Sequence, residues 1–95
     1  MKDYKILCIK DANSVISVLK PQFDSHDFIT IYILTFTTHY LELLKKYKSV
    51  ETTHQQIGQF LQQHSDDLNI SKQGEIESEN ILGNYNVCTL WKKIL

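Results

Sequence analysis

Arginine is missing from this chain of 95 residues, which contains only one proline, two cysteines and three glycines. Without arginine, the chain lacks the side chain that most often contacts guanine in sequence-specific DNA complexes. The chain has ten basic and eleven acidic residues, and the resulting formal net charge of −1 indicates no general affinity for nucleic acid. The glycines at positions 58, 74 and 83 are far apart, which excludes a glycine-rich phosphate-binding loop.

The two cysteines, Cys8 and Cys88, lie inside apolar runs. A disulfide scaffold would need more cysteines, so we interpret these two as buried apolar side chains in a reduced protein. No hydrophobic leader segment follows Met1, and the longest run of strand-like residues, 28–36, is too short to cross a bilayer as a helix. The sequence therefore predicts a cytoplasmic protein with no membrane segment.

The first half of the chain predicts a parallel β-α-β unit within a single domain, residues 1–95. Residues 4–10 are apolar on both faces of an expected strand, and residues 27–37 (DFITIYILTFT) are rich in the β-branched and aromatic side chains typical of strands. Between them, a helix is expected to end before Pro21, because the residue preceding a proline disfavours helical geometry. The link is long enough for a right-handed helical crossover.

The second half predicts a helix pair followed by a hairpin. Apolar residues recur at helical spacing in 39–48 and 53–65, and residues 72–74 are interpreted as a turn. Gly83 and Asn84 then separate two strand-like runs, a hairpin signal that places a β-hairpin over 76–94. We therefore expect an α+β fold of order β-α-β-α-α-β-β, with a mixed sheet of three to five strands, helices mainly on one face and a C-terminal β-hairpin.

Asp11 ends the first expected strand, and this opening resembles the first strand and helix of response-regulator receiver domains. Receivers carry a pair of acids where this chain has Asp11 alone, and the run 27–37 ends without an acid. Phosphoryl transfer needs clustered carboxylates that hold a divalent metal, so the resemblance does not extend to such a site. Asp11 is predicted to favour a helix N-terminus instead.

Residues 24–27 (DSHD) contain three potential metal ligands in four positions. No cysteine or second histidine follows at matching local spacing, so we interpret this stretch as a solvated turn. His54 and His64 would point about 80° apart on one helix and share no ligand face. No serine elbow or locally activated cysteine is present, so neither a cofactor nor catalysis is expected. A weaker hypothesis, a small enzyme or metal binder, would use Asp11, Asp24, His26 and Asp27.

The helices 39–48 and 53–65 with the hairpin 76–94 together look like a winged-helix layout. This is the alternative function, a DNA-binding regulator whose second helix enters a major groove. The balanced charge and the acidic residues near the expected wing argue against it, and the run 27–37 has no place in a plain winged helix. The residues involved would be Gln55, Gln56, Gln59, Gln63, Lys92 and Lys93.

Tyr85, Val87 and Trp91 share one face of the last expected strand. That strand is apolar on both faces, so these side chains either pack in the chain's own core or form a homodimer interface, where aromatic side chains are enriched. The leading hypothesis is therefore a small non-catalytic interaction protein of the cytoplasm, which forms a homodimer through Tyr85, Val87 and Trp91.

Overall fold

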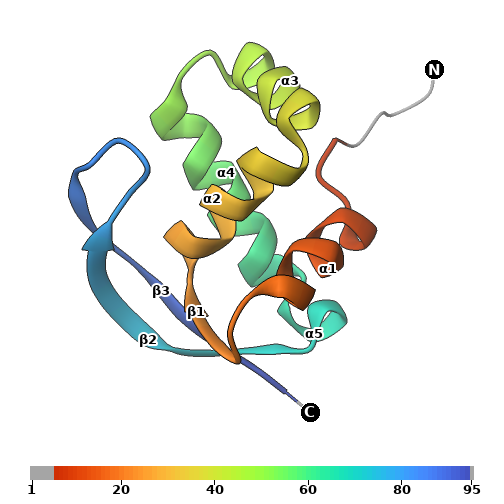
Figure 1. Cartoon of the computed structure of the whole chain (residues 1–95), viewed down its shortest axis with the longest axis vertical. Helices are drawn as coiled ribbons and strands as arrows, with labels where there is room; N and C mark the ends of the chain where they lie inside the picture. Colours follow the sequence, from red (N-terminus) through yellow and green to blue (C-terminus); the bar gives the residue numbers. More distant parts are fainter. Residues whose placement is uncertain (1–5, 95) are drawn as a thin grey trace.

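The structure is a computed structural model that describes residues 6–94, and it combines helices with a three-stranded antiparallel sheet (Figure 1). The expected α+β class and the C-terminal hairpin are confirmed. The helices gather on one side of the sheet (Figure 1). In chain order, the elements are α1 (Ile9–Val18), β1 (Gln22–Asp24), α2 (Ser25–Thr35), α3 (Thr37–Tyr47), α4 (Val50–Gln63), α5 (Ser65–Leu68), β2 (Ile70–Glu79) and β3 (Tyr85–Lys93).

The sheet has the strand order β1-β3-β2, and both pairings are antiparallel. The short strand β1 pairs only with Leu90, Trp91 and Lys92, so the first part of β3 is paired with β2 alone. The register between β2 and β3 shifts between Lys72 and Gly74, and Gly74 has a φ of 140°. The turn expected at 72–74 is therefore an irregularity within β2, at a backbone geometry that suits glycine.

Residues 25–35 form the helix α2, so the strand expected at 27–37 is wrong. Asp24 caps this helix: its side chain accepts a hydrogen bond from the Asp27 backbone N–H at 2.8 Å, and the Asp27 side chain accepts one from the Asp24 N–H at 3.1 Å. Phe28, Ile29 and Tyr32, at helical spacing, are buried. Burial of this face outweighs the modest helix propensity of β-branched and aromatic residues.

The strand expected at 4–10 is also wrong where the structure describes it, because α1 already begins at Ile9; residues 4 and 5 lie outside the described part. Ala12, Val15 and Ile16 form the buried face of α1, which ends at Val18, before Pro21. With both expected strands gone, the parallel β-α-β unit does not form. The element order is α-β-α-α-α-α-β-β over the described residues.

The helices expected at 39–48 and 53–65 are confirmed as α3 and α4. Lys48, in a left-handed conformation with a φ of 69°, ends α3, and Ser49 caps α4 by accepting a hydrogen bond from the Thr52 N–H at 3.0 Å. Thr53, where the apolar pattern placed the start of this helix, lies buried inside α4. The helix therefore starts one turn earlier than its apolar pattern indicates.

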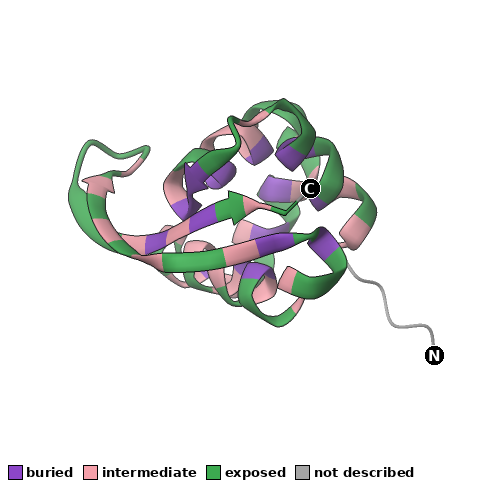
Figure 2. Cartoon of the chain, turned by 90° about the horizontal axis from the view of Figure 1, so that it is seen from below, coloured by how far each residue is buried: buried purple, intermediate pink, exposed green. Residues whose placement is uncertain are grey.

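A core of apolar residues joins the helices to the end of the sheet where β1 pairs with β3. It includes Val15, Phe23, Phe28, Tyr32, Ile57, Leu61, Ile70 and Trp91. The opposite end of the hairpin projects from the body, and its residues are exposed or half-buried (Figure 2). The sheet is thus anchored at one end and unsupported at the other.

Candidate functional site

Trp91 belongs to the core and not to an exposed face. Its side chain is 1% exposed, its Nε1–H donates to Ser25 Oγ at 3.2 Å, and its register partner Phe23 is also buried. Tyr85 and Val87, on the same strand, are 67% and 62% exposed. The prediction that all three residues form one contact face is therefore wrong for Trp91. The last residues of β3 pack in the core, whereas its first residues belong to the projecting part of the hairpin.

The hairpin tip, residues 80–87, carries four exposed large apolar residues. Ile81 and Leu82 lie in the turn, and Tyr85 and Val87 begin β3. The adjoining strand β2 presents exposed carboxylates at alternate positions: Glu75, Glu77 and Glu79. The tip is therefore apolar, next to an acidic strand.

A groove of about 420 Å³ lies between α4, the start of α2 and the hairpin. Gly58 lines it from the middle of α4, and a Cβ atom added there would meet nothing within 4 Å. Glycine inside a helix lowers stability by about 1 kcal/mol relative to alanine, and packing within the chain does not require it here. Other residues lining the groove are His26, Ile29, His54, Leu82, Val87 and Cys88.

A partly buried polar contact joins α3 to α4 beside this groove. Tyr40 Oη lies 2.8 Å from His54 Nε2. Desolvation by burial lowers the pKa of His54, with a smaller contribution from the charge of His26, and burial raises the pKa of Tyr40. Both shifts favour the neutral forms, in which a hydroxyl and an imidazole share one hydrogen bond.

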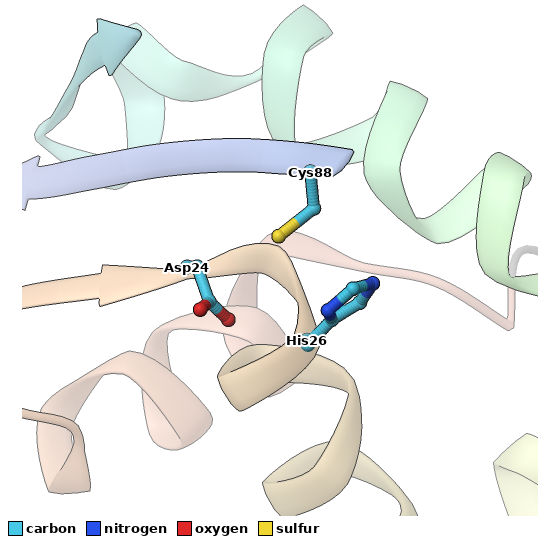
Figure 3. A group of neighbouring side chains, drawn as sticks. All are labelled: Asp24, His26 and Cys88. Atoms are coloured by element: carbon cyan, nitrogen blue, oxygen red, sulfur yellow. The ribbon is translucent and has the colours of Figure 1, made fainter. Parts of the chain in front are cut away.

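Residues 24–27 form the start of α2 and not a solvated turn. Asp24 and Ser25 are each 7% exposed, and His26 Nδ1 lies 2.6 Å from Ser78 Oγ on β2. One ligand-type atom from each of Asp24, His26 and Cys88 lies within 4.8 Å of the other two (Figure 3). A sequence search limited to local spacing misses this group, since Cys88 reaches it only through sheet pairing.

The other residues of the weaker metal-binding hypothesis do not join this group. Asp11 lies in the first turn of α1, as predicted, and its Oδ2 is 3.0 Å from His39 Nδ1. Asp27 contributes its carboxylate to the capping box of α2. His54 contacts Tyr40, and His64 Nδ1 lies 3.6 Å from Asp67 Oδ2.

The residues proposed for DNA contact are distributed over several surfaces. Gln55 lines the groove beside the hairpin, and the other glutamines line a second depression on α4 with Tyr47 and Phe60. Lys93 Nζ donates to the Leu19 carbonyl oxygen at 2.6 Å. The glutamines in the second depression are Gln56, Gln59 and Gln63, and Lys92 is exposed at the end of β3 remote from the hairpin tip.

No protein-family model, curated protein or solved structure matches this chain. Among residues 6–94, no helix is both long enough and apolar enough to cross a bilayer. Cys8 and Cys88 are free thiols, and both are half-buried, so their predicted full burial is not reached. The features of the described residues that bear on function are the hairpin tip, the groove and the three ligand-type side chains.

Proposed function

We propose that this protein is a non-catalytic interaction module of the cytoplasm that self-associates as a homodimer through its hairpin tip. One observation carries the proposal: Ile81, Leu82, Tyr85 and Val87, four large apolar residues, are 44–67% exposed on a projecting hairpin. Several large apolar side chains exposed on one short segment commonly mark a contact with another protein. A cytoplasmic location agrees with two free thiols, since oxidising compartments favour disulfides.

The shape of the hairpin supports contact through the tip. An isolated two-stranded hairpin is only marginally stable in water, and within residues 6–94 the first part of β3 pairs with β2 alone. A second copy that packs its own tip against these side chains would bury apolar area on both chains. Such a two-fold arrangement uses the same surface twice and closes the assembly at two subunits.

The charges on β2 argue against pairing of two copies through that strand edge. Glu75, Glu77 and Glu79 are exposed at alternate positions, so two β2 strands side by side would bring like charges together. Glu77 and Glu79 are the register partners of Val87 and Tyr85, so these two glutamates share a face of the hairpin with the proposed contact. The proposed contact is apolar at Ile81, Leu82, Tyr85 and Val87, and Glu77 and Glu79 lie beside two of these side chains.

Light scattering during size-exclusion chromatography tests the proposal. The wild type should have the mass of a dimer at micromolar concentration. The double variant Tyr85→Ser/Val87→Asn should raise the dissociation midpoint at least tenfold, the change expected when about 1.4 kcal/mol of contact energy is lost. Leu34→Asn is the matched control, because Leu34 is 71% exposed on α2. A monomeric wild type, or an equal shift in the control, would contradict self-association.

Binding to DNA is the second candidate function, and one observation favours it. The helix pair α3 and α4 leads through the single turn α5 into the β2–β3 hairpin, and the segment 25–35 is helical, so the strand that had no place in a winged-helix layout does not exist. The acidic β2 strand keeps this candidate second. A gel-shift assay with duplex pools at two salt concentrations tests it, because a protein–DNA complex lost in Gln55→Ala/Gln59→Ala would favour DNA.

A further inference from the structure

Three side chains that are distant in the sequence converge where β1 meets α2. Asp24 ends β1, His26 lies in the first turn of α2, and Cys88 lies on β3 (Figure 3). We propose that Asp24, His26 and Cys88 bind one divalent transition-metal ion with the coordination chemistry of zinc. This site is independent of the self-association proposed above.

The geometry requires only small movements. One ligand atom from each of the three residues lies within 4.8 Å of the other two. A point central to three such atoms is within about 2.8 Å of each, and zinc bonds to sulfur, nitrogen and oxygen are about 2.0–2.3 Å long. Side-chain shifts of less than about 1 Å therefore bring all three atoms to bonding distance.

Two of the ligands are already held in place by neighbouring groups. One oxygen of Asp24 accepts the Asp27 backbone N–H at 2.8 Å, which leaves the second oxygen for an ion. His26 Nδ1 lies 2.6 Å from Ser78 Oγ, and that hydroxyl lies 3.5 Å from Cys88 Sγ, so an ion bound at Nε2 would keep this contact whereas an ion bound at Nδ1 would replace it. Hydrogen bonds of this kind orient the ligands of metal sites and reduce the ordering that binding requires.

The donor set selects the class of metal. A thiolate and a carboxylate together carry two negative charges, which a divalent ion balances, and the imidazole adds a neutral nitrogen. Sulfur and nitrogen donors suit zinc and its neighbours, whereas magnesium and calcium prefer oxygen ligands throughout. Asp24 is only 7% exposed, and a buried carboxylate gains from a charged partner.

The site has room for a fourth ligand on the groove side. His26 and Cys88 both line the groove between α4 and the hairpin, so a water molecule can complete a tetrahedral set. The bound ion would connect β3 directly to the start of α2. It would fix the base of the projecting hairpin relative to the helices.

Cobalt titration of the metal-stripped, reduced full chain tests the site. Cobalt(II) bound to a thiolate gives charge-transfer absorption, and zinc should displace it at a stoichiometry of one ion per chain. Cys88→Ser and His26→Gln should each weaken cobalt binding by more than about 100-fold. Loss of a group that only supports a metal ligand weakens binding by at most about 100-fold, so a larger effect identifies a direct ligand. Cys8→Ser and His64→Gln, matched changes elsewhere in the chain, should leave it unchanged.

A variant that keeps the helix cap separates metal binding from folding. Asparagine caps helices about as well as aspartate, so Asp24→Asn should retain the wild-type far-UV circular dichroism and still weaken metal binding. Zinc at about 100 times its dissociation constant should raise the wild-type melting temperature by on the order of ten degrees, and this rise should be absent in Cys88→Ser. Absence of charge-transfer absorption in the wild type would overturn the proposal, as would its persistence in Cys88→Ser.

Discussion

Replacing Trp91 by alanine tests the placement of the indole within the chain's own core. The side chain is 1% exposed and packs with Phe23, Phe28 and Ile70 in one buried cluster. Truncation of a buried tryptophan costs about 3–5 kcal/mol in the free energy of unfolding, because the cavity collapses only partly. Ser25 Oγ would also lose the indole N–H that now donates to it.

The free energy lost in Trp91→Ala is large relative to the total free energy of unfolding. A domain of this size has a free energy of unfolding of about 5–15 kcal/mol, so Trp91→Ala would remove a large part of it. Trp91→Phe keeps most of the buried area and removes the donor, and should cost less, about 1–2 kcal/mol. Trp91→Ala should destabilise the protein more than Trp91→Phe because alanine leaves a larger cavity, and neither change alters the charge.

Urea unfolding followed by far-UV circular dichroism measures both variants without depending on tryptophan emission. Leu34→Ala, at a position 71% exposed, is the control and should change stability by no more than about 0.5 kcal/mol. A loss below about 1 kcal/mol for Trp91→Ala would refute the buried placement. Such a result would instead support the prediction that Trp91 lies on a contact face together with Tyr85 and Val87.

Three further predictions concern α4. Gly58→Ala should raise the free energy of unfolding by about 0.5–1 kcal/mol, measured by urea unfolding, because an added Cβ meets nothing within 4 Å; destabilisation would show that the site is occupied by the chain itself. Ser49→Ala should cost about 0.5–2 kcal/mol by loss of the cap on the Thr52 N–H, and an unchanged midpoint would count against that cap. Burial lowers the pKa of His54 below 6.5, so the unfolded chain binds a proton at this residue before the folded chain does. In chelator-treated protein, the contribution of His54 to the free energy of unfolding should therefore be fully present above pH 6.5 and should fall as the pH drops toward the lowered pKa. His54→Gln should flatten this pH dependence, and an equally steep profile in the variant would refute it.

Local spacing was sufficient to predict the helix pair and the hairpin of the second half, but not that β2 continues through residues 72–74. Apolar residues at three- and four-residue intervals place α3 and α4. Gly83 with Asn84 marks the connection between β2 and β3, although this connection spans residues 80–84 and not Gly83 and Asn84 alone. These signals depend on contacts within a few positions of the chain, which the sequence shows directly. The helix signal in the first half was present too, since Asp24 and Asp27 have the spacing of a capping box.

The strand-like composition of residues 25–35 led to the wrong prediction there. Their propensity favours a strand, but a helix buries Phe28, Ile29 and Tyr32 together against the core, and tertiary packing outweighs propensity. Composition cannot show which neighbours a face will meet. That information exists only once the other elements are in place.

The sequence by itself determined the α+β class, the helix pair, the hairpin and the role of Asp11 in a first helical turn. Only the tertiary structure decided that Trp91 is a core residue and that Cys88 lies beside Asp24 and His26. The physical reason is the pairing of β1 with β3, which sets Asp24 opposite Leu90 and so carries Cys88 to the start of α2. Contacts between residues this distant depend on strand register, and strand register is not a local property of the chain.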